Sequence, residues 1–310
     1  MKILVVGGAG LIGGHAALRL AQSGHDVVIA GRNAPAEDTP LGKLPFQRLD
    51  FVNDDPPADL LSRFDALVFS AGNDIRHVPK GADYFQHVTQ ANTIAQPRFF
   101  AAARDAGVRT AINIGSFYPH VAPHLLDSNP YVRSRYEAWL KTRALACPDF
   151  KVVSIDAPSV VGTVPGQISM FAAFVRYVEG RLLDAPVVAP AGGVTWVSTD
   201  TVSDCVEALL ERGETGRGYL IGDESLTHQQ IFGAFCEAVG KPAPPVSQDE
   251  HPILPDISLA WGRGNSLYFN ANPQDAAMLN YRRGDVLRTI REEIVPQYAG
   301  ASFPIRLDVF

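Results

Sequence analysis

Short apolar runs alternate with amphipathic helical patterns over most of the chain. The runs have the length and β-branched content of buried strands and lie at residues 2–6, 26–30, 66–70, 110–114 and 152–155. Helical periodicity occurs between or after them at residues 14–23, 86–106 and 131–146. Strands and helices that alternate in this way predict a parallel sheet covered by helices on both faces.

The alternation loosens after about residue 162, which predicts a second, smaller unit. Further helices are predicted at 170–180 and 227–239, the second with Thr227 as its N-cap, and Asp200 is predicted to cap another helix. We expect an α/β fold, a Rossmann-type doubly wound parallel sheet with a small discontinuous C-terminal substrate lobe. The sheet unit is expected to hold residues 1–163 and segments near 192–240, and the lobe residues 164–191 and 241–310.

Composition narrows the class of protein. Among 310 residues, 19% are charged, the net charge is −6 and no basic run occurs, which argues against a nucleic-acid partner. The three cysteines lie far apart and indicate a reducing compartment, and no apolar stretch is long enough to span a membrane. We expect a cytoplasmic protein that binds a small-molecule substrate. The eight histidines show no metal spacing, so no metal is expected.

The first apolar run leads directly into a glycine-rich turn, Gly7-Gly8-Ala9-Gly10-Leu11-Ile12-Gly13, which a helical pattern follows. Strand, glycine turn and helix form the setting in which a dinucleotide pyrophosphate is bound. Gly7 permits a tight turn, Gly10 lets backbone amides approach the phosphates, and Gly13 lets the helix lie close to the strand. The amides of the helix N-terminus then face the anion.

The second strand indicates which dinucleotide is bound. NAD-specific folds place an acidic side chain at the end of this strand, where it binds the ribose 2′-hydroxyl. Here that place holds Gly31-Arg32-Asn33. The Arg32 guanidinium can pair with a 2′-phosphate and stack on adenine, whereas the alternative is a solvated surface arginine. We therefore predict NADP as cofactor, with NAD as second choice.

The spacing G-x-x-G-x-x-G resembles that of extended and atypical short-chain dehydrogenases/reductases, the NAD-dependent epimerase/dehydratase family. The resemblance covers roughly residues 1 to 240 and implies further cofactor contacts. Those residues are Asp50 and Phe51 at the adenine, Ser70, Ala71 and Gly72 flanking the cofactor, Asn92 steadying the active site, and Pro158 and Val160 at the nicotinamide. Three of these segments have an ordinary alternative: a strand end with a loop acid for Asp50 and Phe51, a tight turn for residues 70–72, and a surface helix position for Asn92.

The same resemblance supplies the catalytic residues. The family uses a serine at a strand end, a tyrosine that transfers a proton, and a lysine four residues after it. Ser116 follows the strand at 110–114, and Tyr131 lies one helical turn before Arg135. Arginine replaces the family's lysine, but its charge is expected to lower the pKa of the phenol and its fork to hold ribose hydroxyls. Tyr118 is a competing proton donor.

Two functions of different class follow from these residues. The first is an NADP-dependent oxidoreductase or epimerase that transfers hydride on a small hydroxyl or carbonyl compound. The second is a catalytically weak or inactive NADP-binding redox sensor, which the change from lysine to arginine favours; a subunit that needs the cofactor only for folding is a third. His120 and His124, between Ser116 and Tyr131, could contact substrate.

The resemblance also implies an assembly. The helices at 86–106 and 131–146 correspond to those that form a dimer interface in many family members, so a homodimer is possible. Phe99, Phe100, Trp139 and Leu140 could supply its apolar surface, and ordinary core packing is the alternative for each.

Overall fold

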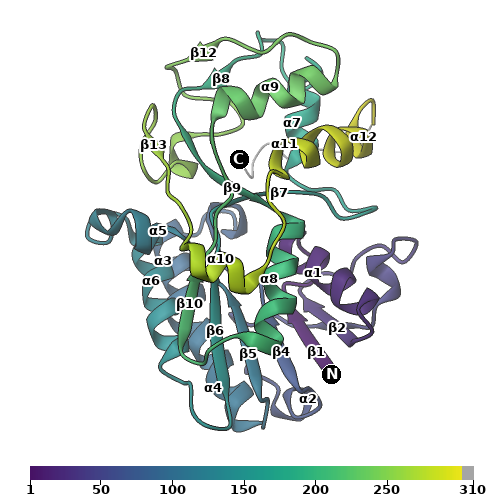
Figure 1. Cartoon of the computed structure of the whole chain (residues 1–310), viewed down its shortest axis with the longest axis vertical. Helices are drawn as coiled ribbons and strands as arrows, with labels where there is room; N and C mark the ends of the chain where they lie inside the picture. The colour runs from purple at the N-terminus through teal and green to yellow at the C-terminus, as the bar shows by residue number, and fades with distance from the viewer. Residues whose placement is uncertain (302–310) are drawn as a thin grey trace.

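Seven parallel strands form the central sheet of the larger lobe of the computed structural model, which describes residues 1–301 (Figure 1). Their order is β10-β6-β5-β4-β1-β2-β3, so the strand order reverses between β1 and β4. The strands are β1 (Lys2–Val6), β2 (Asp26–Gly31), β3 (Phe46–Arg48), β4 (Ala66–Phe69), β5 (Thr110–Ile114), β6 (Lys151–Asp156) and β10 (Arg217–Leu220). This arrangement confirms the predicted doubly wound α/β fold.

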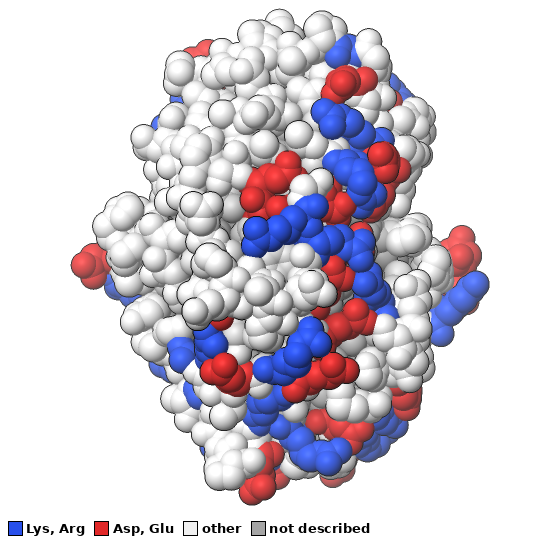
Figure 2. Space-filling model, viewed as in Figure 1, with Lys and Arg blue, Asp and Glu red and all other residues white. Residues whose placement is uncertain are grey.

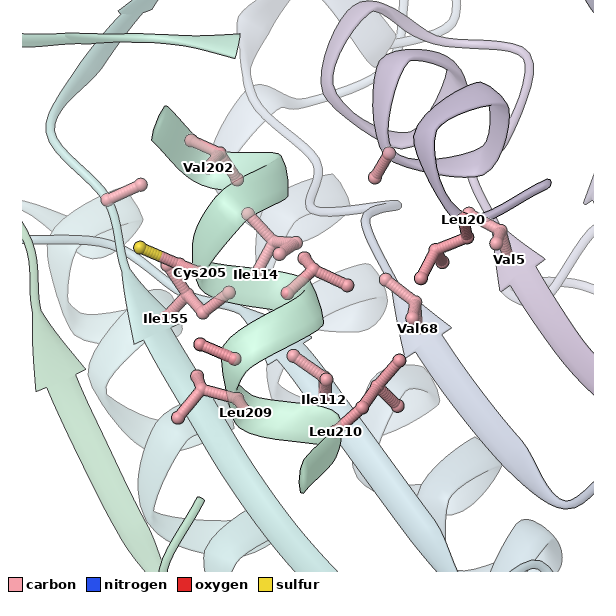
Figure 3. Packing of buried hydrophobic residues seen from close by; sticks show 14 of the residues in the cluster. Val5, Leu20, Val68, Ile112, Ile114, Ile155, Val202, Cys205, Leu209 and Leu210 are labelled. Atoms are coloured by element: carbon pink, nitrogen blue, oxygen red, sulfur yellow. The ribbon is translucent and has the colours of Figure 1, made fainter. Parts of the chain in front are cut away.

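Alternate residues of each strand pack against helices on opposite faces of this sheet. Ile3 and Val5 belong to one core, with α1 and α8, whereas Leu4 and Val6 belong to another, with α2 and α4. Figure 3 shows α8 lying over the strands in the first of these cores. The covering helices are α1 (Leu11–Gln22), α8 (Thr199–Arg212) and α10 (Pro273–Leu279) on one face, and α2 (Ala58–Leu61), α4 (Gln96–Asp105) and α6 (Pro130–Arg143) on the other.

A second lobe lies above the first in Figure 1 and has its own aromatic core. In this core Phe174 of α7 stacks on Phe232 of α9 with ring centroids 5.2 Å apart. Its strands are β11 (Glu224–Thr227), β9 (Gly193–Ser198) and β13 (Ser266–Leu267), with β7 (Ser159–Val161) beside β9, and the pair β12 (Val246–Ser247) and β8 (Ala189–Pro190). Its helices are α7 (Phe171–Val178), α9 (His228–Ala238), α11 (Val286–Thr289), η6 (Ile290–Ile294) and α12 (Val295–Tyr298).

The chain passes repeatedly between the two lobes. After β6 it enters the second lobe, returns for α8 and β10, leaves with β11, returns for α10 and leaves again for α11. The boundaries expected from the sequence therefore differ at several elements. The strands β7, β9 and β11 and the helix α9 lie in the second lobe rather than the sheet unit, and α10 packs on the large sheet rather than in the lobe. Residues 302–310 of the expected lobe lie outside the described residues.

Short elements occupy the connections. They are η1 (Leu41–Lys43), η2 (Ile75–His77), α3 (Tyr84–Val88), η3 (Thr89–Ala95), α5 (Tyr118–Val121), η4 (Pro123–Leu125) and η5 (Asp256–Ser258). The helix predicted at 86–106 is thus three consecutive elements, α3, η3 and α4, and η3 is a π-helical segment. A wider π turn within a helix often marks a functional site.

The helix caps show where local sequence signals were sufficient. Thr227 caps α9 as predicted, in a reciprocal capping box with Gln230. The prediction for Asp200 is wrong, because the Ser198 hydroxyl accepts from the Thr201 amide at the start of α8. Asp200 lies one residue into the helix and instead pairs with Arg19, 3.2 Å away.

Ion pairs join the helices on the face that carries α8 and α10. Figure 2 shows basic and acidic side chains interspersed over this face. Arg19 of α1 and Arg282, just after α10, both pair with Asp204 of α8 at 2.7 and 2.9 Å. The opposite charges neutralise one another, so this face presents no basic surface. Among residues 1–301, none of the helices is long and apolar enough to cross a membrane.

The suggestion that Phe99 and Phe100 supply a dimer surface is wrong. Both rings are fully buried in the core beneath α4, and Phe69 of the sheet contacts each of them. Within the two segments expected to form the dimer interface, 86–106 and 131–146, the side chains of Ile94 in η3 and Leu140 in α6 remain about half exposed.

Candidate functional site

The turn between β1 and α1 has the backbone geometry that an anion site requires. Gly7 adopts a positive φ of 79°, and a Cβ at Gly13 would clash with the Gly7 carbonyl. Gly10 is the N-cap of α1, and no side chain of residues 1–301 caps its first turn. The amides at the helix N-terminus are therefore available to a phosphate.

Two cavities meet at this turn. The larger, of about 940 Å³, extends along the carboxyl ends of β2 and β3, and the smaller, of about 460 Å³, extends between the two lobes. Gly10, Ser70 and His77 line both of them. Together they form one trough that crosses the switch point of the sheet, where doubly wound folds bind their ligands.

The structure distributes the predicted site residues between these cavities. The larger cavity is lined by Gly7, Arg32, Asp50, Phe51 and Ala71, and the smaller by Leu11, Ile12, Gly13, Gly72, Ser116, Tyr131, Arg135, Pro158 and Val160. Of the predicted residues, Asn92 lines neither. This division separates the residues predicted for the adenine end from those predicted for the nicotinamide end.

In the larger cavity, Arg32 is an exposed cation and Asp50 is a carboxylate already engaged in its own loop. Asp50 accepts from the Val52 amide at 3.1 Å and from the Asn53 side chain at 2.8 Å. Phe51 is buried edge-on against Phe69. Arg32 is therefore a cation at this end of the cavity that can bind a phosphate.

Asn92 lies in the π-helical segment η3 and is fully buried, so the surface alternative for it is wrong. Its oxygen accepts from the Asn73 amide at 2.9 Å, and its nitrogen donates to the Asn73 carbonyl at 3.0 Å. The same nitrogen donates to the Ser134 hydroxyl of α6 at 3.1 Å. Asn92 thus ties the loop after β4 to the helix that carries Tyr131.

Arg135 is buried between the ends of two strands. One terminal nitrogen donates to the Ile114 carbonyl at 2.9 Å, at the end of β5. A Cβ at position 72 would overlap the guanidinium, so this arginine depends on a glycine after β4. The Ile114 carbonyl holds the guanidinium in place, and Arg135 lines the smaller cavity together with Tyr131.

Tyr131 stands in the first turn of α6, where Asn129 is the cap. The Asn129 oxygen accepts from the amides of Tyr131 and Val132 at 3.0 and 3.2 Å. Burial raises the pKa of the Tyr131 phenol above its ordinary value, and the Arg135 charge offsets only part of the rise. The Arg135 charge does lower the pKa of this phenol, as expected, but burial raises it by more, so the pKa ends above its ordinary value.

Tyr118, the competing proton donor, also lines the smaller cavity. Its ring packs edge-on against Tyr131 with centroids 6.1 Å apart. Burial raises the pKa of the Tyr118 phenol well above its ordinary value, and no nearby cation opposes this in the described part of the chain. Tyr131, with Arg135 one turn away, is the better placed of the two phenols.

His120 does not line either cavity. Its Nε2 lies 2.9 Å from Asp156 Oδ2, and Trp139 donates to the same oxygen at 3.0 Å. Asp156 is buried at the end of β6, where it also accepts from Ser154 at 2.6 Å. This network supports the strand ends beneath Ser116.

Several cavity residues were not found from the sequence. Asp74 is the N-cap of η2, Arg76 and His77 belong to η2, and Ile253 and Ile257 come from the segment before β13. Asp74 and His77 form a capping box, a short-range signal that was detectable after the strand at 66–70. The second lobe's residues carry no local signal, because tertiary packing alone brings them to the cavity. No three His, Cys, Asp or Glu among residues 1–301 are grouped to hold a metal ion.

Comparison with known proteins gives the relationships of the chain. Residues 3–222 match the model of the NAD dependent epimerase/dehydratase family. The fold resembles UDP-glucose-4-epimerase from Stenotrophomonas maltophila with bound NAD (TM-score 0.75, 19% identity, 96% of this chain and 98% of that one). It also resembles UDP-N-acetylglucosamine 4-epimerase from Bacillus cereus (TM-score 0.72, 15% identity, 99% of each chain). No curated protein matches the chain.

Proposed function

The chain belongs to the NAD-dependent epimerase/dehydratase family, and from this premise we propose that it is an NADP-dependent oxidoreductase or epimerase. It acts on a small hydroxyl or carbonyl compound, with Tyr131 as proton donor and acceptor. The observation that carries the proposal is the single cavity lined by Ser116, Tyr131 and Arg135, which continues directly from the glycine turn. Hydroxyl, phenol and cation thus face one space next to the dinucleotide site.

The residues present fit a nicotinamide dinucleotide. The backbone amides in the first turn of α1, which Gly10 leaves without a side-chain cap, can bind the pyrophosphate, and the two cavities accommodate the two ends of such a molecule. When bound, the cofactor supplies or accepts a hydride. The epimerase from Stenotrophomonas maltophila is described with bound NAD, but Arg32 after β2 and the absence of a carboxylate in Gly31-Arg32-Asn33 favour NADP.

Each catalytic side chain has a distinct task in this proposal. Ser116 donates a hydrogen bond to the substrate oxygen and polarises the carbonyl. Tyr131 gives its phenolic proton to that oxygen in reduction and takes it back in oxidation. Since burial raises its pKa, Tyr131 is the neutral phenol at neutral pH, which is the donating form. Arg135 stabilises the phenolate that forms and donates to the cofactor's ribose.

The test is Tyr131→Phe, with Tyr136→Phe on the same helix as matched control. Loss of a positioned proton donor should lower kcat roughly 10²- to 10⁴-fold. Cofactor affinity, followed by fluorescence titration with NADPH, should change little, because the backbone amides of α1 and the side chain of Arg32 bind the cofactor in this proposal and the variant alters neither. Full turnover in Tyr131→Phe would refute the role of this tyrosine.

One observation favours the second candidate, an NADP-binding sensor. Arg135 is anchored to the Ile114 carbonyl and cannot be deprotonated, so it cannot pass protons along as lysine does. Tight NADPH binding without turnover of any carbonyl or hydroxyl compound would identify a sensor. Measurable hydride transfer would exclude it.

A further inference from the structure

Apolar side chains of the second lobe line the part of the smaller cavity that faces Tyr131. Phe171 and Phe174 of α7 and Trp196 of β9 form one wall. Ile253, Leu254 and Ile257 form another, on the segment around η5. Because the nicotinamide end of the cofactor must share this space of about 460 Å³, the room that remains suits a small ligand.

Few charged side chains line this cavity, and two of them, Asp74 and Arg76, pair with each other. Within residues 1–301, the charged side chains that line the cavity are Asp74, Arg76 and Arg135. Arg76 places Nε 3.1 Å and Nη2 2.5 Å from the Asp74 carboxylate, and Nη1 points to the Met170 sulfur at 3.0 Å. Arg135 is held by the Ile114 carbonyl at the cofactor side.

A diphosphate needs cations that this wall does not offer. Two of the solved structures of similar fold are described with UDP-glucose and with UDP-glucuronic acid, whose diphosphate carries two negative charges. Burying such charges without paired cations is strongly unfavourable, and Arg76 would have to leave Asp74 to pair with them. An uncharged apolar ligand gains from contact with the same aromatic and aliphatic side chains.

We propose that the substrate is an uncharged molecule with an aryl or alicyclic body that carries one carbonyl or hydroxyl group, and not a nucleotide-sugar. The apolar body lies against Phe171, Phe174 and Ile253, and the oxygen faces Ser116 and Tyr131. This inference rests on the proposed function, because it places the reacting oxygen at those two residues. The reduction is balanced: a hydride from the cofactor adds to the carbonyl carbon, and a proton from Tyr131, restored from solvent, adds to its oxygen.

The first test is binding to the protein loaded with NADPH. Acetophenone and cyclohexanone should raise its melting temperature and quench its tryptophan fluorescence, because Trp196 lines the cavity. UDP and UDP-glucose should do neither. Stabilisation by UDP or UDP-glucose, or no response to either ketone, would overturn the inference.

The second test places a charge at the cavity mouth. Ile257 is about half exposed and lines the cavity, so Ile257→Lys should fold. It should raise the Kd for acetophenone about tenfold, as a cation replaces an apolar contact. Ile168→Lys, at a similarly exposed isoleucine outside the cavity, is the matched control and should leave this Kd unchanged. Equal effects of the two variants would contradict the proposed site.

Hydride transfer separates this inference from the proposed function. Ketone binding without oxidation of NADPH refutes the oxidoreductase and supports the apolar site. Turnover of UDP-glucose supports the proposed function and overturns the apolar substrate. Turnover of acetophenone at least ~10-fold more efficient than that of hydroxyacetone supports both, since only the first buries an aryl ring.

Discussion

Arg135 and Gly72 are coupled across two strand ends. The guanidinium occupies the space that a side chain at position 72 would fill, and it is fastened to the Ile114 carbonyl. A lysine at 135 would have neither the fork nor the need for this glycine. Gly72 and the Ile114 carbonyl therefore accommodate the arginine, and they hold a permanent cation one helical turn from Tyr131.

The pH dependence of catalysis should reflect this cation. Alcohol oxidation needs the phenolate of Tyr131, and burial raises the pKa of that phenol, so kcat/KM should rise with pH through the alkaline range. Arg135→Gln retains a donor for the Ile114 carbonyl but removes the charge that lowers this pKa. The rise should then move to higher pH, and pH profiles of both proteins measure the shift. Arg135→Lys should restore the original profile. Identical pH profiles for Arg135→Gln and the parent protein would contradict the role of the Arg135 charge.

Cofactor choice is a second property of single residues. Arg32 is exposed in the larger cavity, where it can pair with a 2′-phosphate. Arg32→Ala should weaken NADPH binding by roughly 1.5–3 kcal/mol and NADH binding by much less. Parallel fluorescence titrations give both affinities, and Arg48→Ala, at an exposed arginine outside both cavities, serves as control. Equal losses for the two cofactors would remove Arg32 from the phosphate site.

Residues whose role depends on neighbours in sequence were predictable, and residues placed by tertiary contacts were not. Gly7, Gly10 and Gly13 could be identified from the sequence because their spacing within one short turn forms a recognisable motif. Ile253 and Ile257 reach the cavity from nearly the other end of the chain, with no spacing or motif to mark them. The pKa of Tyr131 also needed the structure, since its burial depends on the second lobe.

At the scale of elements, the long strands and helices followed from apolar periodicity. The two-residue strands β8 and β12 did not, because their pairing rests on contacts between distant segments rather than on their own sequence. The π-helical segment η3 was equally hidden within a continuous helical pattern. Its wider turn carries Asn92, which joins α6 to the loop after β4.

Helix α6 links stability to catalysis through its first turn. The Asn129 side chain satisfies the amides of Tyr131 and Val132. Asn129→Ala should lower the free energy of unfolding by about 1 kcal/mol and should also lower kcat, since the frayed turn carries the proton donor. Urea denaturation and steady-state kinetics measure the two effects. Asn129→Asp keeps a capping oxygen and should restore both the free energy of unfolding and kcat. A loss of stability in Asn129→Ala with an unchanged kcat would show that the cap does not affect catalysis.

At the scale of the whole molecule, the second lobe should limit acid stability. Burial lowers the pKa of His251 to about 4, and its Nε2 lies 3.1 Å from the Val188 carbonyl. Between about pH 6.5 and pH 4 the unfolded chain binds a proton at His251 that the folded chain does not. The free energy of unfolding should therefore fall by up to roughly 3 kcal/mol as the pH is lowered through this range. His251→Gln should flatten this fall in urea melts at several pH values, whereas His124→Gln, at an exposed histidine, should not.

Assembly is the other property at this scale. We propose that a homodimer forms through the paired elements η3 and α6, where Ile94 and Leu140 remain exposed. Ile94→Glu should shift the protein from dimer to monomer in sedimentation velocity, because a buried unpaired carboxylate is costly. Ile168→Glu introduces the same charge elsewhere and should leave the dimer intact. A monomeric parent protein would dismiss the proposal directly.

The repeated passage of the chain between the lobes limits how such a protein can be diversified. A substrate lobe encoded by one continuous stretch can be exchanged in a single recombination event. Here α8, β10 and α10 of the sheet unit alternate in sequence with β9, β11 and α11 of the second lobe. A chimaera that acquires a relative's specificity must therefore be spliced at several matched junctions. Change by point substitution in the cavity wall, as at Ile257, is the more accessible route to a new substrate.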